Sequence, residues 1–498
     1  MHAIRYGRQF VELFIVAMMA MVAPAFAAQA QADTAKAPAE GPAAASQDEE
    51  LIKRGEYLAT AGDCIACHTV PGGKPFAGGL LMPTPVGNVM TTNITPSKSH
   101  GIGNYTLQDF IVAVREGKGP DGKHFYPAMP YTSYALVTDD DLKAMYAYFM
   151  RDVEPVDTKP AQTDLPFPFN IRASMAVWNL FFLQSKPYEP DPGKDTVWNR
   201  GAYLTRGLAH CSACHTPRNA LMAEKGSSEL AGADIGPWYA PNITSDPVSG
   251  IGDWSNEELV VYMKTGRVQG KAQTARPMAE AIDHSLQYLT DEDLMAIAVY
   301  LKSVPAIRQP GEEKPAHAWG APHQEWASLR GTPLPDDPDL MTGAQLYDAE
   351  CASCHQAQGQ GSRGLPSLFH SSAVGRTNTN NLVMVILDGI TRGHGEEAGI
   401  VMPGYRNALS DTQIVNLSQY VVGHFGHPDA TVTADQVARL RRGEVAGPDL
   451  VRIARVAIVA VAVLVLLLIV GAVLWRRRRR LARRRELGRE MARRRIVR

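Results

Sequence analysis

The 498-residue sequence has only six cysteines, and all of them lie in three copies of one short pattern, Cys-x-x-Cys-His. Because no cysteine lies outside these copies, we expect no disulfide framework. The sequence also lacks a glycine-rich nucleotide-binding fingerprint between a strand and a helix. Its periodicities are helical and few runs resemble strands, so we expect a mostly α-helical protein without a dinucleotide-binding fold.

The three copies of the pattern are Cys64–His68, Cys211–His215 and Cys351–His355. This spacing is typical of covalent c-type haem attachment, in which two thiols form thioethers and the adjacent imidazole binds the iron. A redox-active dithiol or half of a zinc site also uses Cys-x-x-Cys. Neither alternative explains why histidine follows all three pairs. We therefore predict three covalent haem c groups, with six thioether cysteines and three axial histidines: Cys64, Cys67, Cys211, Cys214, Cys351, Cys354, His68, His215 and His355.

The N-terminus has the pattern of a secretory signal peptide. Arg5 and Arg8 form a basic start, Phe10 to Val22 is largely apolar, and Ala25-Phe26-Ala27 is a small-residue cleavage signal. A retained anchor is the alternative, but the cleavage pattern favours removal of residues 1–27. Export agrees with the predicted haem groups, because this type of haem attachment takes place outside the cytoplasm.

The C-terminal region predicts a single membrane anchor. Val456 to Trp475 is a run of uncharged residues rich in Val, Leu, Ile and Ala, followed by an arginine-rich tail over residues 476–498. A helix of about 20 apolar residues matches the roughly 30 Å hydrocarbon core of a bilayer. A buried core helix is the alternative, but such a helix is not followed by a tail of this charge. The positive-inside rule places the tail in the cytoplasm and the preceding domains in the periplasm, at the inner membrane.

The near-neutral charge of the whole chain, −1, conceals an acidic central part. The tail contributes +11 and the first 27 residues contribute +1, which leaves −13 for residues 28–475. An acidic exposed region argues against nucleic acid as a partner. The arginines of the tail are suited to anionic lipid headgroups.

The central part of the chain repeats one arrangement three times. A helix-like stretch with a glycine and an aromatic residue precedes each haem motif, at Leu51–Leu58, Asn199–Leu204 and Thr342–Tyr347. Each unit closes with a helix whose N-terminus is marked by Thr138, Thr290 or Ser410 followed by acidic residues or glutamine. Units one and two also share an Asn-Ile-Thr segment. The predicted haem domains are residues 51–153, 195–307 and 339–428, with connecting segments at 28–50, 154–194, 308–338 and 429–455.

This arrangement resembles the class I cytochrome c domain, and the resemblance implies that the helix before each haem motif crosses the closing helix. Each iron then needs a sixth ligand. Three methionines lie at matching places shortly before the closing helices: Met129, Met278 and Met402. Methionine ligation raises a haem potential, although methionine is also a common core residue. The histidine alternatives near these positions are His124, His284 and His394, whereas His210 is interpreted as a positional coincidence.

One segment between the first two units, Ile171 to Leu183, is apolar on most sides but too short to span a bilayer. It either packs between domains or forms a contact surface for a partner subunit or the membrane interface.

The whole pattern resembles the triheme cytochrome c subunit of the membrane-bound periplasmic dehydrogenases of acetic acid bacteria. The resemblance implies an electron-transfer subunit without catalytic residues of its own. Its partners would be ubiquinone and a catalytic subunit of quinoprotein, flavoprotein or molybdenum type that oxidises an alcohol, aldehyde, polyol or sugar acid. A small accessory subunit is a further candidate partner. Two rival functions stay open at this point: a cytochrome subunit of a terminal oxidase, and a haem peroxidase with a displaced ligand, for which Met278 is the best place to look.

Overall fold

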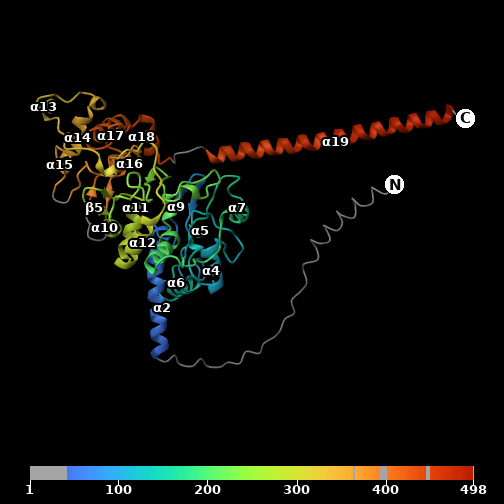
Figure 1. Cartoon of the computed structure of the whole chain (residues 1–498), viewed down its shortest axis with the longest axis horizontal. Coiled ribbons are helices and arrows are strands. Elements are labelled where there is room, and N and C mark those ends of the chain that lie inside the picture. The colour runs from blue at the N-terminus through green and yellow to red at the C-terminus, as the bar shows by residue number, and fades with distance from the viewer. Residues whose placement is uncertain (1–41, 363–364, 393–400, 445–448, 497–498) are drawn as a thin grey trace. The chain divides into compact units, whose positions relative to one another are not determined.

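The computed structural model describes residues 42–362, 365–392, 401–444 and 449–496. The chain divides into two units, residues 1–48 and 49–498. In the first unit, the structure describes only the start of one helix. The predicted signal peptide, residues 1–27, lies outside the described residues. The second unit contains the three haem motifs, and its elements are shown in Figure 1.

The described chain is mostly helical, and its strands form only short two-stranded antiparallel hairpins. This confirms the fold class predicted from the sequence. The elements around the first haem motif are α2 (Pro42–Ala61), α3 (Cys64–His68), β1 (Leu81–Thr84), β2 (Gly87–Met90), α4 (Leu107–Glu116), α5 (Tyr131–Tyr134) and α6 (Asp139–Arg151), followed by α7 (Ser174–Phe182).

The elements around the second motif follow a similar order, with several additional short elements. They are α8 (Thr196–Tyr203), the π-helix η1 (Leu204–Leu208), α9 (Cys211–His215), η2 (Gly226–Ser228), β3 (Ala233–Ile235), β4 (Trp238–Ala240), α10 (Asn256–Thr265), β5 (Arg267–Val268), β6 (Ala272–Gln273), α11 (Met278–His284), η3 (Leu286–Tyr288) and α12 (Asp291–Ser303).

The third motif belongs to a further helical domain, which precedes a long C-terminal helix. Its elements are η4 (Ala316–Ala318), α13 (Trp326–Leu329), η5 (Pro338–Leu340), α14 (Gly343–Glu350), α15 (Ala352–His355), α16 (Asn380–Asp388), β7 (Ile390–Thr391), β8 (Val401–Met402), α17 (Asp411–Phe425) and α18 (Ala434–Arg441); the C-terminal helix is α19 (Leu450–Ile496).

In each domain the helix before the haem motif crosses the closing helix at a glycine. A Cβ atom on Gly55 of α2 would overlap the carbonyl oxygen of Ala144 in α6. Gly201 of α8 meets α12 in the same way, and Gly343 of α14 meets α17. The missing side chain lets the two backbones approach closely, so the glycines that the sequence places ahead of each motif set the helix crossing.

The closing helices begin where their capping residues predict. The hydroxyl groups of Thr138, Thr290 and Ser410 accept hydrogen bonds from the third amide of α6, α12 and α17. Ser410 also forms a full capping box with Gln413. A cap satisfies amide groups that the first helical turn leaves without a partner, which explains why these helices start at fixed residues.

The first two domains share one hydrophobic core, and the third has its own. A reciprocal pair of hydrogen bonds connects the first two: Tyr57 donates to Asp293 (2.6 Å), and Tyr203 donates to Asp141 (2.5 Å). Each tyrosine lies on the helix before a haem motif, and each aspartate lies in the first turn of the other domain's closing helix. The two domains therefore contact one another through equivalent surfaces.

The segments that the sequence predicts as linkers also contain helices. Helix α2 begins at Pro42, inside the stretch 28–50. The stretch 429–455 contains α18, whose Val437 and Leu440 are buried in the core of the third domain. These apolar residues need a hydrophobic surface, and α16 and α17 provide it.

Helix α7 packs on one face and is exposed on the other. The side-chain oxygen of Asn179 accepts from the Tyr131 hydroxyl (2.8 Å), and the Trp178 indole donates to the carbonyl of Leu221 (2.9 Å). In contrast, Leu180 and Phe181 are 79% and 71% exposed. The helix thus forms hydrogen bonds with both of the first two domains on one face and presents apolar side chains to its surroundings on the other.

Helix α19 has the length and apolar composition of a membrane-spanning helix. Its apolar side chains over residues 456–475 are exposed. The helix continues through the arginine-rich segment to Ile496, so the predicted span is the first part of a longer helix.

Candidate haem-binding sites

The three motif histidines have the same local geometry. The Nδ1 atom of His68 lies 2.6 Å from the carbonyl oxygen of Thr92, that of His215 lies 2.6 Å from the carbonyl of Pro241, and that of His355 lies 3.0 Å from the carbonyl of Pro366. A carbonyl can only accept, so Nδ1 carries the proton in each ring. Nε2 is then left as the unprotonated nitrogen, the form that binds a metal ion.

Two of these carbonyls belong to the repeated Asn-Ile-Thr segments. Asn93, the residue after Thr92, accepts from the amide and hydroxyl of Thr95 and donates to the carbonyl of Val156 (2.7 Å). Asn242 repeats these bonds around Pro241, with Thr244 and the carbonyl of Ile307 as partners. The sequence repeat therefore has a structural purpose: it fixes the backbone carbonyl that orients the histidine.

Burial favours the neutral forms of Cys64, Cys67, Cys211, Cys214 and Cys351 and of the three motif histidines. It raises the pKa of the Cys64, Cys211 and Cys351 thiols to about 12 and that of Cys214 to about 11. Burial also lowers the pKa of His215, although its hydrogen bond to Pro241 opposes this shift. Zinc sites need thiolates, so these apolar surroundings suit a hydrophobic macrocycle better than a zinc ion.

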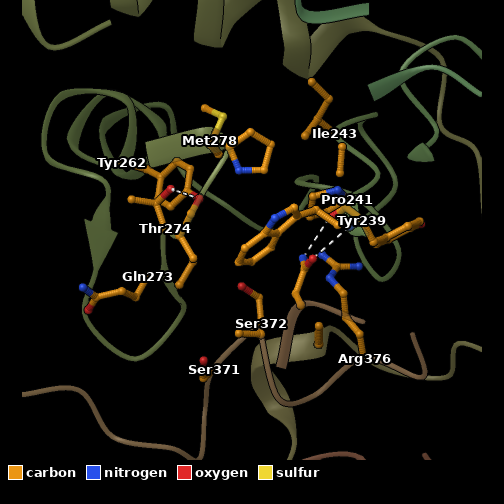
Figure 2. A pocket seen from close by; sticks show the side chains of 18 of the residues that line it. Tyr239, Pro241, Ile243, Tyr262, Gln273, Thr274, Met278, Ser371, Ser372 and Arg376 are labelled. Carbon is orange, nitrogen blue, oxygen red and sulfur yellow. Dashed lines mark hydrogen bonds between the residues drawn. The ribbon is translucent and has the colours of Figure 1, made fainter. Parts of the chain in front are cut away.

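The second and third sites open into one cavity of about 340 Å³. His215 and Met278 line it from the second domain, and His355 and Met402 line it from the third. Figure 2 shows that its labelled side chains come from both domains: Tyr239, Tyr262 and Met278 on one side, and Ser372 and Arg376 on the other. Both of these histidines and both of the methionines predicted as their partners thus line the same cavity.

The first site lies next to the second. Cys67 is close enough to Cys214 for the two groups to interact electrostatically, and Ala61 and Asp63 line the same cavity as His215. Cys64 and Met129 both pack against the core that the first two domains share. The three motifs therefore form a consecutive series, in which the second is adjacent to both others.

Arg376 is a functional candidate that the sequence pattern does not reveal. It comes from the third domain, lines the cavity, and its charge lowers the pKa of His215 in the second domain. Its Nε is buried and has no hydrogen-bond partner, and its nearest acid, Glu312, is 3.9 Å away. A buried guanidinium with a free donor fits a haem, whose propionates are acceptors. No motif marks this residue, because its position depends on the packing of two domains.

The alternative histidines lie in different surroundings. His124 has a buried Nδ1 without a hydrogen-bond partner, His284 ends α11, and His394 lies outside the described residues. His210 precedes the second motif in a left-handed backbone conformation (φ 37°), as Asp63 precedes the first (φ 51°). Burial lowers the pKa of His210 to about 4, and its ring packs edge-on against Tyr134 of the first domain. His210 therefore has a structural place between the first two domains.

The family model for cytochrome c matches residues 52–151, 200–305 and 340–424. The chain belongs to the cytochrome c family. The three matched stretches correspond to the three haem domains predicted from the sequence repeat, and this cytochrome c protein carries haem c in three copies.

Relatives place it among the cytochrome subunits of dehydrogenase complexes. It is 47% identical to the fructose dehydrogenase cytochrome subunit of Gluconobacter japonicus over 414 residues, which cover 81% of this chain and 85% of the relative. It is 41% identical to the gluconate 2-dehydrogenase cytochrome c subunit of Pantoea cypripedii (80% and 91%) and 38% identical to the quinone alcohol dehydrogenase cytochrome c subunit of Gluconacetobacter polyoxogenes (79% and 85%). The resemblance inferred from the sequence is confirmed: this is an electron-transfer subunit of an oxidoreductase complex.

Proposed function

We propose that the six motif cysteines attach the haems and that each iron has a histidine and a methionine ligand. The pairs are His68 with Met129, His215 with Met278, and His355 with Met402. The observation that best supports this assignment is the common orientation of the three imidazoles, each with Nδ1 bonded to a backbone carbonyl. The shared cavity supports the second and third pairs.

A haem c bound at each site supplies a one-electron iron couple. The protein's part is to set the surroundings of that couple. The backbone carbonyls of Thr92, Pro241 and Pro366 hold the axial imidazoles in one tautomer, and the buried aromatic core excludes water. Arg376 places a positive charge beside the second site. Chemistry on the organic substrate then belongs to another polypeptide.

That polypeptide, in our proposal, is the catalytic subunit of a quinone-dependent dehydrogenase that oxidises a sugar, sugar acid, polyol or alcohol. The names of the relatives support sugar, sugar acid and alcohol substrates, and the quinone named for one of them supports ubiquinone as the acceptor. The apolar stretch of α19 and the arginines after it favour a single span with the haem domains in the periplasm and the C-terminus in the cytoplasm, against inner-membrane lipids.

Co-purification and substrate-driven reduction test this function. Full-length protein isolated from membranes should co-purify with a larger dehydrogenase subunit. In those membranes, one sugar or alcohol substrate should reduce the haems. Reduction should stop when the dehydrogenase gene is deleted, with haem content unchanged. Co-purification with a copper–haem oxidase, or reduction that survives the deletion, would contradict the proposal.

The axial ligands are tested by substitution. Met278→Ala and Met402→Ala should each weaken the long-wavelength methionine-to-iron absorption band, because each removes one thioether ligand. Met175→Ala, on α7 and outside the three haem domains, is the matched control and should leave the band unchanged. An unchanged band in Met278→Ala would show that another group binds the second iron.

A further inference from the structure

A second cluster of metal-binding side chains lies in the third domain, apart from the haem motif. His323 and Glu325 precede that domain's first long helix, α14, and His424 lies in the last turn of α17. The Nε2 atoms of both histidines approach the same carboxylate oxygen: Glu325 Oε1 is 3.2 Å from His323 and 3.4 Å from His424. The three candidate ligand atoms all lie within 4.8 Å of one another.

These separations suit a small tetrahedral ion. Bonds of about 2.0–2.1 Å at tetrahedral angles place neighbouring ligand atoms roughly 3.3–3.4 Å apart. Both Nε2 atoms face the same carboxylate oxygen, and the two imidazole rings lie side by side with centroids 3.7 Å apart and planes 3° from parallel. Binding one ion would tilt the two rings toward each other, because an imidazole binds a metal in the plane of its ring. Two imidazoles and one carboxylate form the donor set of open zinc sites, in which water completes the coordination.

The surrounding contacts hold the three ligands in place. The second carboxylate oxygen of Glu325 lies 3.4 Å from the Ser328 hydroxyl, which also donates to the Glu325 carbonyl (2.7 Å). The ring of Tyr420 packs against His424 with centroids 4.6 Å apart. Gly320, three residues before His323, packs so closely on the end of α17 that a Cβ atom would overlap the carbonyl of Phe425. Ligands fixed by outer contacts bind metal ions better than mobile ones.

The cluster is also accessible. The side chains of His323, Glu325 and His424 are each about one-third exposed (33%, 34% and 33%), so an ion can enter and a water molecule can reach it.

From this geometry we propose that His323, Glu325 and His424 bind one divalent transition-metal ion of the zinc type, with water as the remaining ligand. The ion would tie the segment before α14 to the closing helix of the third domain. The backbone amide of His323 donates to the carbonyl of Gln358 (3.4 Å), three residues after His355, so the same ion would stiffen the chain beyond the third haem motif.

The test uses the full-length haem protein in detergent, stripped of loosely bound metal with a chelator and then dialysed. Calorimetric titration with Zn²⁺ should show one saturable equivalent, and added Zn²⁺ should raise the thermal midpoint of the protein. His424→Ala and His323→Ala should each weaken binding at least about tenfold and abolish the thermal shift. The exposed His100→Ala is the matched control and should behave as the parent protein.

Unchanged haem content and visible spectrum in each variant would establish that the haem domains are folded. If the parent protein binds no more Zn²⁺ than His424→Ala, the proposal is wrong and the cluster is a hydrogen-bonded triad of two histidines around one carboxylate. The proposal is equally wrong if Zn²⁺ shifts the midpoints of the parent protein and both histidine variants by the same amount.

Discussion

At the scale of single residues, each motif histidine depends on a backbone carbonyl far from it in the sequence. Thr92, Pro241 and Pro366 supply these carbonyls, and each fixes which ring nitrogen carries the proton. The proposed thioether cysteines and axial histidines could be assigned from the sequence, because the chemistry of haem attachment requires them in one short local pattern. Their carbonyl partners could not, because only the tertiary fold brings them to the ring.

Arg376 should tune the potential of the second haem. Replacing it with glutamine removes a buried positive charge that stabilises the reduced, less positive iron, so the midpoint potential should fall. For an effective dielectric constant of about 20 and an assumed separation of roughly 10–15 Å, Coulomb's law gives about 1.1–1.7 kcal/mol. This equals roughly 50–70 mV for a one-electron couple. Spectroelectrochemical titration of Arg376→Gln measures this change in the midpoint potential of the second haem.

Arg330→Gln is the matched control for this measurement, because Arg330 is exposed and belongs to the same domain. Its titration curve should superimpose on that of the parent protein. A second-haem potential that is unchanged or higher in Arg376→Gln would show that the guanidinium does not act on that iron.

At the scale of helices, the crossing of the first and closing helices is fixed by glycine. Gly201→Ala places a methyl group against the Ala296 carbonyl of α12 and should lower stability by roughly 1–3 kcal/mol through steric overlap. Gly423 of α17 has open space around its Cβ position, so Gly423→Ala should instead stabilise by up to about 1 kcal/mol through helix propensity. Thermal unfolding, followed by the haem spectrum, shows whether each variant is less or more stable than the parent protein. If Gly201→Ala is as stable as the parent protein or more stable, the close crossing is refuted.

The long helices and their caps could be predicted, because caps and helical periodicity are local properties of the chain. The short elements could not. Residues 434–441 make a helix of only about two turns, which is too short to be stable alone. Helix α18 is stabilised because Val437 and Leu440 pack into the core of the third domain. The hairpin strands have two to four residues each, too short for a pattern of alternation.

At the scale of the whole molecule, the first two domains are joined by equivalent surfaces. Tyr57→Phe and Tyr203→Phe each remove a hydrogen bond from a hydroxyl to a carboxylate, and each should cost about 1.5–3 kcal/mol. Chemical unfolding should therefore show the first two domains separating at lower denaturant in the double variant. Tyr146→Phe, which removes a bond inside one domain, is the control and should not separate them.

The same interface should weaken in acid. Burial alone would raise the pKa of Asp293, but hydrogen bonds from Arg200 and Tyr57 outweigh it and lower that pKa. A carboxyl group whose pKa is lower in the folded protein than in the unfolded chain stabilises the fold at pH values above its pKa in the unfolded chain. This stabilisation is lost as the pH falls through the pKa of the group in the folded protein. Chemical unfolding at a series of pH values measures the loss. Equal stability at neutral pH and in acid would contradict this role of Asp293.

Membrane attachment through α19 can be separated from haem binding by two truncations. A chain ending at residue 444 keeps α18 and should be released from membranes with its haems intact. A chain ending at residue 428 also loses Val437 and Leu440 from the third core and should have a lower thermal midpoint. Ultracentrifugation, haem staining and thermal unfolding measure these outcomes. Retention of the longer truncated chain in membranes that lack the dehydrogenase subunit would show that a segment other than α19 holds it.

The most direct measurement is the number of covalent haems per chain, by pyridine haemochrome assay and intact mass. The parent protein should carry three, one for each motif. Replacing both cysteines of any one motif with alanine should leave two, with the other motifs still loaded. Two or fewer haems in the parent protein, or three in any such variant, would contradict the assignment of one haem to each Cys-x-x-Cys-His motif.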